Sequence, residues 1–161
     1  MISVTTCWRM MMSNFFIPNW PAPPHIKSIQ TLRVGGNSEG KYSSFNLATH
    51  VNDDINSVHL NRDLLNQFLP SPPHWLNQTH SVDVIKIPSP VFNADASYTT
   101  EKNTVCVVQT ADCLPLLVTN IEGTIVASIH AGWRGLLNDV IEKTIEKMNI
   151  STNELLVWLG P

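Results

Sequence analysis

The sequence predicts an α/β (α+β) fold built from mixed β-sheets. Three β-rich runs follow one another closely at 104–110, 114–120 and 124–130. Two further segments, 54–69 and 134–148, repeat apolar residues with the spacing of an amphipathic helix. The chain has 161 residues, of which 43% are hydrophobic, so it can bury one core of ordinary size. Strands and helices combined in this way are typical of a mixed α/β domain.

The N-terminal half is expected to contain one strand, one long loop and one helix. Apolar and polar residues alternate at 26–34, which predicts a strand. Three glycines with serines and asparagines at 35–46 predict turns, and a loop of this length inside a compact domain is often functional. Asp53 and Asp54 offer caps for the helix expected over 54–69.

The C-terminal half is expected to be richer in strands. Strands are expected at 74–80, at 82–87 and, after a loop over 88–103, in the three β-rich runs. Glu122 and Gly123 predict a hairpin turn between the last two of these runs. The helix over 134–148 carries apolar residues on one face and charged residues on the other. A buried strand is expected to begin at residue 155 and to stop at the closing Gly-Pro.

Composition excludes several classes of protein. The net charge is -3, only 14% of residues are charged, and no basic cluster exists, so the sequence does not indicate a nucleic-acid partner. No apolar run approaches roughly 18 residues, so no membrane span is expected. The three cysteines are too few and too scattered for a disulfide framework, which favours a reducing, cytoplasmic setting. Cys106, inside a β-rich run, is interpreted as a core residue.

Residue types near the N-terminus indicate where the domain begins. Residues 1–28 are rich in proline and are expected to form an N-terminal arm, whereas 29–161 is expected to form the domain. Met12 is an alternative start to Met1. The N-terminal apolar runs are short and interrupted, which argues against a signal peptide. The sequence leaves the oligomeric state open.

Two histidines and one cysteine lie where expected strands meet loops. His80 ends a strand at a bend, Cys113 begins a strand, and His130 ends one. Loops on one edge of a sheet converge, so these side chains form a candidate ligand set for Zn²⁺, with Cu²⁺ as the alternative. Three protein ligands would leave the fourth position free, as in catalytic zinc sites. The competing interpretation is that Cys113 is a small buried apolar residue, because the spacing of the three residues matches no zinc finger.

A second candidate feature is the turn HAGWRGL at 130–136. Gly132 and the glycine at 135 permit tight backbone geometry, and the following helix start favours an anion. Arg134 can add a bidentate contact to phosphate or carboxylate. The alternative is that this turn only packs the helix on the sheet. Asp112 either orients a ligand histidine or caps its loop, and Asp95 is a loop carboxylate of the same ambiguous kind.

The remaining candidates carry weaker signals. The other four histidines have no supporting neighbours and are interpreted as exposed or locally hydrogen-bonded: His25, His50, His59 and His74. Arg62 lies on the first expected helix, where a solvated side chain is the ordinary interpretation.

Several motifs in order resemble a known family. They are SSFNLATHVNDD (43–54), NRDLL (61–65), QTHSVDV (78–84), NADAS (93–97), QTADCLPLLV (109–118), HAGWRGLL (130–137) and WLGP (158–161). They resemble the motifs of the multicopper polyphenol oxidase, or laccase-domain, family, which includes purine nucleoside phosphorylases and the bacterial peptidoglycan editing factor. The resemblance spans roughly residues 30–161.

The resemblance implies a fold and a site. The implied fold is an α/β/β/α layered sandwich, distinct from the cupredoxin barrels of true laccases. The implied cofactor is Zn²⁺ held by His80, Cys113 and His130. The residues expected to contact substrate, by the family match and the loop position, are Arg33, Ser44, Asn46, Arg62 and Gly132. Arg134 is expected to contact phosphate, and with Asp112 it completes the candidate catalytic set.

The resemblance also implies an activity. The expected reactions are phosphorolysis of adenosine, inosine, guanosine and methylthioadenosine, together with deamination of adenosine, so the expected partners are a purine nucleoside and phosphate. Copper-dependent oxidation of phenols is the older description of the family. In the family the chain continues past the LGP motif, so the C-terminal part is expected to be missing here. An inactive remnant that binds nucleoside and a hydrolase that edits cell-wall precursors remain alternatives.

Overall fold

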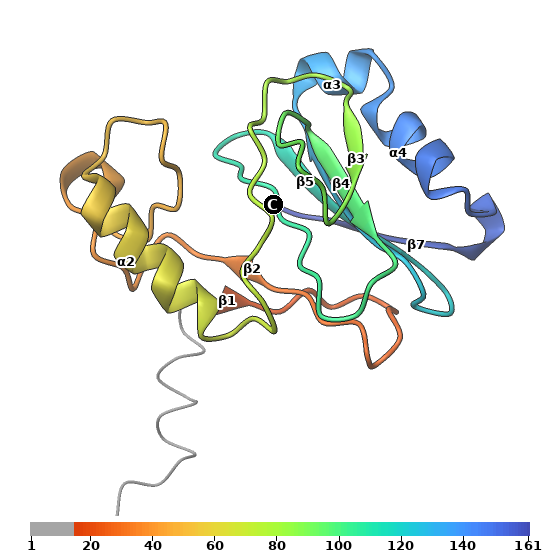
Figure 1. Ribbon diagram of the computed structural model, residues 1–161, viewed down its shortest axis with the longest axis horizontal. Helices are drawn as coiled ribbons and strands as arrows, with labels where there is room; N and C mark the ends of the chain where they lie inside the picture. Colours follow the sequence, from red (N-terminus) through yellow and green to blue (C-terminus); the bar gives the residue numbers. More distant parts are fainter. Residues whose placement is uncertain (1–14) are drawn as a thin grey trace, which may run out of the picture. The chain divides into compact units, whose positions relative to one another are not determined.

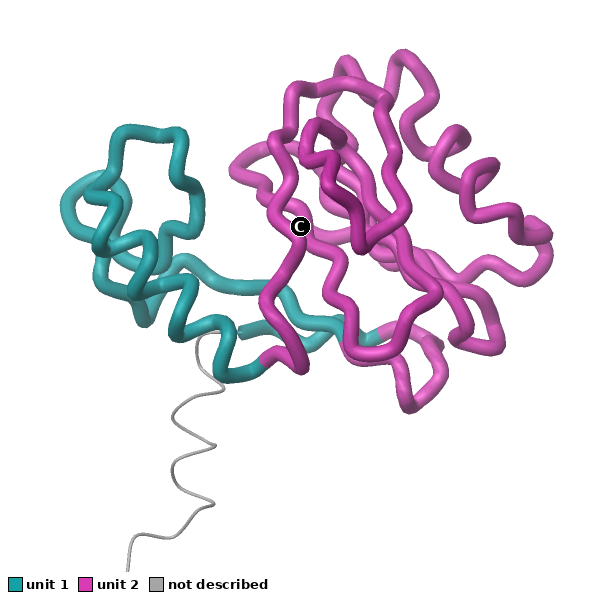
Figure 2. The backbone as a smooth tube through the Cα atoms, viewed as in Figure 1, with its two compact units in different colours: residues 1–19, 28–68 teal, residues 20–27, 69–161 magenta. Residues whose placement is uncertain are grey.

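A computed structural model describes residues 15–161 of the chain, which form two compact units (Figure 2). Unit 1 contains residues 15–19 and 28–68 of the described part, and unit 2 contains residues 20–27 and 69–161. The first half of the expected N-terminal arm, residues 1–14, lies outside the described residues and includes both candidate start methionines. None of the helices in the described part is long and apolar enough to cross a membrane.

Unit 1 begins with a short two-stranded ribbon. Strand β1 (Phe15–Phe16) pairs antiparallel with β2 (Gln30–Thr31). The strand expected over 26–34 was therefore predicted too long, because only two of its residues find a pairing partner. The loop that follows contains one turn of 3-10 helix, η2 (Gly40–Tyr42).

Helix α2 (Ile55–Asn66) confirms the helix predicted over 54–69. Asp54 caps its N-terminus, because the Asp54 carboxylate accepts hydrogen bonds from the backbone N–H groups of Asn56 and Ser57. The helix also organises the preceding loop through its buried Asn61. The Asn61 amide donates to the carbonyl oxygen atoms of Ser44 and Asn46, and it accepts from the backbone of the same loop.

Unit 2 is built on a five-stranded mixed sheet (Figure 1). Its order is β3 (Val84–Lys86), β4 (Ala96–Thr99), β6 (Val126–Ala131), β5 (Leu114–Asn120) and β7 (Leu155–Leu159). β3 and β4 run parallel, whereas the other three pairs are antiparallel. The predicted class, mixed α/β with mixed sheets, is confirmed.

Helices α3 (Trp133–Leu137) and α4 (Val140–Met148) lie on one face of this sheet (Figure 1). The apolar face of α4 packs against β3, β4 and β6 around a core that includes the fully buried Val140 and Ile129. One continuous helix was predicted over 134–148. The structure divides it because Asp139 adopts a left-handed backbone with φ of 69°, which an α-helix cannot contain. A 3-10 turn, η3 (Thr152–Glu154), then leads into β7.

Three other elements differ from the prediction. Among the described residues, 74–80 and 104–110 form isolated bridges and no continuous strand, and one of these bridges joins His74 to Cys106. β4 lies inside the segment predicted as a loop over 88–103. Its residues Ala-Ser-Tyr-Thr carry a weak strand signal, but strands on both sides supply hydrogen-bond partners, and this tertiary context decides the conformation.

The hairpin between β5 and β6 confirms its prediction. Gly123 has φ of 65°, a left-handed conformation that glycine adopts without a steric penalty. Its N–H donates to the carbonyl oxygen of Asn120. The resulting antiparallel register places Pro115 opposite His130, so the first residues of β5 lie beside the last residues of β6.

Candidate metal centre

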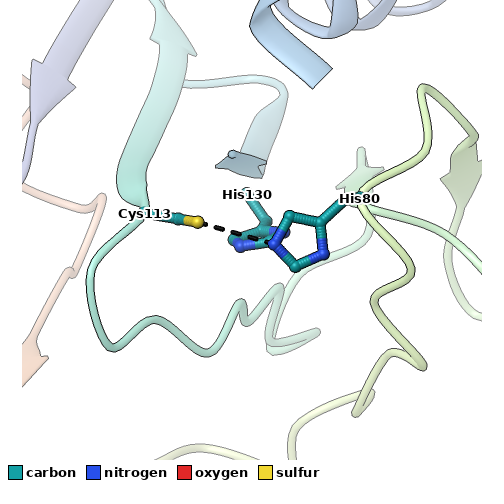
Figure 3. A group of neighbouring side chains, drawn as sticks. All are labelled: His80, Cys113 and His130. Carbon is teal, nitrogen blue, oxygen red and sulfur yellow. Dashed lines mark hydrogen bonds between the residues drawn. The ribbon is translucent and has the colours of Figure 1, made fainter. Parts of the chain in front are cut away.

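His80, Cys113 and His130 converge at one end of the unit 2 sheet (Figure 3). One candidate ligand atom from each residue lies within 4.8 Å of the other two. The Cys113 Sγ and His80 Nε2 atoms are 3.6 Å apart, and the two imidazole rings meet edge to face at 4.8 Å between centroids. The structure thus brings together three residues that are far apart in the sequence.

The sheet register explains two of these positions. His130 is the fifth residue of β6, and Cys113 immediately precedes Leu114, which pairs with Ala131. A residue at the start of β5 must therefore lie close to a residue at the end of β6. His80 lies in the loop before β3, and its position depends on a contact with the residue that precedes the neighbouring strand β4.

That contact is made by Asp95, which directly precedes β4 and is fully buried. The Asp95 carboxylate accepts hydrogen bonds from the backbone N–H groups of Thr79, His80 and Ser81 at 3.1, 3.0 and 2.7 Å. It also accepts from the Ser81 hydroxyl at 2.8 Å and from His130 Nδ1 at 2.7 Å. Both histidine-bearing segments are therefore attached to one carboxylate.

The electrostatics of Asp95 follow from these contacts. Burial alone would raise the pKa of its carboxyl, because the charged form loses water. Hydrogen bonds from His130, Ser81 and Thr79 outweigh this effect and lower the pKa to about 2. Asp95 is consequently ionised at neutral pH and can only accept hydrogen bonds.

The orientation of His130 follows from its ionised partner. A carboxylate accepts only, so His130 Nδ1 must carry the proton in their 2.7 Å hydrogen bond. In the neutral imidazole the Nε2 lone pair is then free to bind a metal ion. A histidine whose second nitrogen donates to a carboxylate is the usual arrangement at protein zinc sites.

Cys113 is the half-buried third member of the group. Burial raises the pKa of its thiol, and the negative charges of Asp112 and Asp95 raise it further. The thiol is therefore protonated in the metal-free protein, and a cation must displace that proton to gain a thiolate ligand. Thiolate and Asp95 carboxylate together carry two negative charges, which a divalent cation would balance.

Gly132 lies directly beside the group, where there is no room for a side chain. A Cβ atom at this position would lie 2.6 Å from His80 Cδ2 and 3.1 Å from Cys113 Sγ. Any side chain here would therefore strike two of the three candidate ligands. The backbone at Gly132 has φ of -69° and ψ of 162°, an ordinary extended conformation, so the requirement for glycine is one of space.

The donor set and its spacing fit a small divalent ion. Bonds of about 2.3 Å to sulfur and about 2.0 Å to nitrogen in a tetrahedron separate the two donor atoms by about 3.5 Å. The observed Sγ–Nε2 distance is 3.6 Å, so this edge already matches, whereas separations of up to 4.8 Å within the group must shorten when an ion binds. Among the described residues, this is the group of histidine, cysteine and acidic side chains that can hold a metal ion.

Arg134 and Asp112 flank the group in sequence. Both are exposed, and the Arg134 guanidinium carbon lies 4.4 Å above the ring centroid of Trp133, which is 64% exposed. α3 has only five residues, so a contact to an anion here would depend on the Arg134 side chain more than on the helix dipole. Asp112 Oδ1 lies 3.8 Å from Cys113 Sγ, whereas the carboxylate that holds a candidate ligand histidine is Asp95.

The candidate substrate residues of unit 1 have intramolecular partners. Arg33 donates to the carbonyl oxygen atoms of Ser43 and Lys41. The Ser44 hydroxyl accepts from Gly36 N–H, the Asn46 amide donates to Asp53, and Arg62 donates to the carbonyl oxygen of Leu47. These contacts order the loop before α2, and the substrate role of Arg33, Ser44, Asn46 and Arg62 stays a prediction.

Sequence reasoning undervalued Asp95. The sequence places Asp95 in a segment predicted as a loop, whereas the structure buries it directly before β4, where an acidic side chain requires several partners. The four histidines interpreted as exposed or locally bonded agree with the structure. His25 and His74 contact backbone carbonyl oxygen atoms, and His50 and His59 are exposed.

A mixed α/β fold that carries a preformed His-Cys-His group defines a class of candidate metal-dependent proteins. The chain belongs to the family described as multi-copper polyphenol oxidoreductase laccase, which residues 27–161 match. Among curated relatives it is similar to a purine nucleoside phosphorylase of Pseudomonas aeruginosa, with 44% identity over 93% of this chain and 62% of the relative. It is also similar to the Haemophilus influenzae purine nucleoside phosphorylase, with 47% identity over 89% of this chain and 61% of the relative.

Solved structures give the same relationship. A Neisseria meningitidis protein matches with a TM-score of 0.88 and 42% identity, over 92% of this chain and 62% of that one. YlmD from Geobacillus stearothermophilus matches with a TM-score of 0.76 and 27% identity, over 89% of this chain and 62% of that one. The chain thus spans about three fifths of the length of the curated relatives named here.

Proposed function

We propose that this chain acts as a zinc-dependent purine nucleoside phosphorylase. The observation that carries the proposal is the convergence of His80, Cys113 and His130 in a chain 44% and 47% identical to two proteins named purine nucleoside phosphorylase. The proposed substrates are adenosine, inosine, guanosine and methylthioadenosine, each with inorganic phosphate. A second proposed activity is deamination of adenosine.

Phosphorolysis exchanges one bond at the sugar. A phosphate oxygen forms a bond to the ribose C1′ atom, the C1′–N9 bond breaks, and the departing purine takes up a proton. The products are the free purine and ribose 1-phosphate. Negative charge on the phosphate must be held close to the sugar, and a guanidinium is suited to this because it can donate two parallel hydrogen bonds.

We assign the phosphate contact to Arg134. The Arg134 side chain is exposed. In the sequence it comes two residues after Gly132, which lies directly beside His80 and Cys113. Stacking on Trp133 limits the positions that the Arg134 side chain can take before phosphate arrives. Asp112 is exposed and lies 3.8 Å from Cys113 Sγ. We assign it to accept a hydrogen bond from a substrate bound beside the ligand group.

His80, Cys113 and His130 would hold the zinc ion, and Asp95 would keep both histidines in place. When bound, zinc supplies a Lewis acid that polarises a substrate oxygen or an attacking water molecule. Deamination of adenosine would use the same position, since water replaces the 6-amino group and ammonia leaves. Gly132 would keep the approach to the ligands open because it carries no side chain.

A copper-dependent polyphenol oxidase is the second candidate, and the description of the matching family favours it. The same nitrogen and sulfur donors accept copper, which generally binds such sites more tightly than zinc. Within residues 15–161, however, the donors form one three-residue group, and reduction of oxygen to water takes four electrons. A single copper ion supplies these poorly, so we favour the nucleoside reaction.

Two further possibilities make different predictions. A protein that binds nucleoside without turning it over would bind inosine but release no hypoxanthine. It is worth testing because the chain spans about three fifths of the relatives' length. A hydrolase that edits cell-wall precursors would act on muropeptides, and only the family resemblance favours it.

Metal analysis followed by a phosphorolysis assay tests the proposal. The chain, purified without added copper, is expected to contain zinc near one per chain and to release hypoxanthine from inosine only when phosphate is present. Cys113→Ser should abolish both properties. Cys106→Ser is the matched control, because Cys106 Sγ contacts the carbonyl oxygen of Val126 and belongs to no ligand group in the described chain.

Each alternative would give its own result. Copper in place of zinc, with oxygen-dependent oxidation of phenols, would favour the polyphenol oxidase. Inosine binding without hypoxanthine release would favour the non-catalytic protein. Full activity in Cys113→Ser would remove the metal group from the mechanism.

A further inference from the structure

The two segments that carry His80 and His130 are joined through a single buried side chain. Within the described part of the chain, the Asp95 carboxylate accepts five hydrogen bonds, and all of them come from these segments. We propose that Asp95 is the positioning residue of the metal centre: it fixes the backbone that presents His80, sets the tautomer of His130, and so assembles the ligands before any metal arrives. The inference rests on the proposed metal centre.

Asp95 stabilises an unusual backbone conformation at His80. His80 has φ of 60°, a left-handed conformation that non-glycine residues adopt rarely and at a steric cost. Successive N–H groups bent around a left-handed residue form a concave site for an anion. The N–H groups of Thr79, His80 and Ser81 all point at Asp95, so the carboxylate offsets that cost.

Asp95 also fixes the position of the His130 imidazole proton. Asp95 Oδ1 accepts from His130 Nδ1 at 2.7 Å, and the His130 backbone N–H donates to the Asp95 carbonyl oxygen at 2.7 Å. The residue is therefore held at both its ring and its main chain. With the proton fixed on Nδ1, the Nε2 atom carries the lone pair that a metal needs.

Geometry links the two effects. Oδ1 accepts from both His80 N–H and His130 Nδ1, so one oxygen atom sets the relative position of the two histidines. The rings meet at 4.8 Å with an interplanar angle of 78°. Asp112, by contrast, lies 3.8 Å from Cys113 Sγ and forms no hydrogen bond with a histidine ring of the described residues, so it adds charge without positioning a ring.

Asp95→Asn and Asp112→Asn form a matched pair of variants. Each replaces one carboxylate near the group by an amide of the same shape. Zinc affinity is measured by competition with a chromogenic chelator. We expect Asp95→Asn to weaken zinc binding about 10- to 100-fold, the effect typical of removing the partner of a ligand histidine. Asp112→Asn should change the affinity less than about threefold. Equal losses in both variants would overturn the proposal, because charge alone would then explain the effect.

A second measurement needs no variant. The ¹⁵N chemical shifts of the His130 side chain in the metal-free wild-type chain report which nitrogen carries the proton. In the neutral ring we expect the proton on Nδ1 and none on Nε2. A His130 ring protonated on Nε2 alone, or rotating between tautomers, would overturn the proposal even if Asp95→Asn failed to fold.

These measurements separate the inference from the proposed function. Neither requires phosphorolysis, so a chain that binds zinc with the expected His130 tautomer but releases no hypoxanthine would refute the enzymatic proposal alone. A phosphorolytic chain whose zinc affinity is unchanged in folded Asp95→Asn would refute only the positioning role.

Discussion

Gly132→Ala is the most selective perturbation of the metal group, because it removes no ligand and adds a single methyl group. The new Cβ would lie 2.6 Å from His80 Cδ2, 3.1 Å from Cys113 Sγ and 3.3 Å from His80 Nε2. The backbone at Gly132 is extended, with φ of -69°, and accommodates alanine without strain. The whole effect must therefore come from contact with the ligands.

The distances give the size of the effect. The His80 ring must retreat by about 0.8 Å for Cδ2 to reach ordinary van der Waals contact at 3.4 Å. Metal–ligand distances tolerate changes of only about 0.2 Å. His80 would then lie beyond bonding distance of the ion, or the ion would shift with His80 away from the other two ligands. In either case zinc affinity should fall at least about tenfold. The free energy of unfolding of the metal-free chain should fall by about 1–3 kcal/mol, as expected for an overpacked site.

The assay is chelator competition for zinc, with urea unfolding of the metal-free protein measured in parallel. Gly135→Ala is the matched control in the same turn. Its Cβ would lie at 3.2 Å from Val140 Cγ1 and 3.3 Å from the Ser81 carbonyl oxygen, which is also tight but touches no candidate ligand atom. Zinc affinity should stay unchanged in this control. A folded Gly132→Ala chain that binds zinc as tightly as wild type would refute the reasoning.

Three further predictions concern acid stability, phosphate binding and the helix break. The pKa of the Asp95 carboxyl is about 2 in the folded chain, below the value of 3.8 for a free carboxyl. Ionised Asp95 therefore stabilises the fold by about 2 kcal/mol above pH 4, and this stabilisation is lost as the pH falls toward 2. Between pH 5 and pH 3, the free energy of unfolding measured with urea should fall by about 1 kcal/mol more in wild type than in Asp95→Asn. Arg134→Ala should raise the phosphate KM at least about tenfold with little change in zinc content, and an unchanged KM would remove Arg134 from phosphate binding. Asp139→Gly should raise the free energy of unfolding by about 0.5–1 kcal/mol in thermal melts, since glycine adopts the left-handed conformation at residue 139 without steric cost; a decrease would contradict this explanation of the break.

Local sequence signals predicted the elements whose conformation is decided locally. Asp54 caps α2 as its residue type indicates, and apolar runs with a Gly turn gave β5 and β6. The signals failed where pairing partners decide the outcome. β4 is a strand because β3 and β6 enclose it, whereas the β-rich segment 104–110 finds a bridging partner only at Cys106 among the described residues.

In the candidate site too, some residues could be predicted from local signals and others depend on tertiary contacts. Positions at strand ends suggested His80, Cys113 and His130, and the family resemblance strengthened the choice. Asp95 was left ambiguous because its importance lies in five hydrogen bonds to segments 14 to 35 residues away in sequence. Gly132 was expected to contact substrate through a tight turn, but its Cβ position reveals a requirement for space beside two candidate ligands. Such requirements depend on three-dimensional proximity and leave little trace in a single sequence.

X-ray absorption at the zinc edge of the purified chain tests the central claim most directly. We predict one sulfur neighbour at about 2.3 Å and two imidazole nitrogen neighbours at about 2.0 Å around a zinc ion bound at one per chain. Cys113→Ser, which is expected to bind no zinc, should give no such shell. A shell of nitrogen and oxygen alone in the wild-type chain, or a chain that binds no divalent metal, would contradict the assignment of His80, Cys113 and His130 as one metal centre.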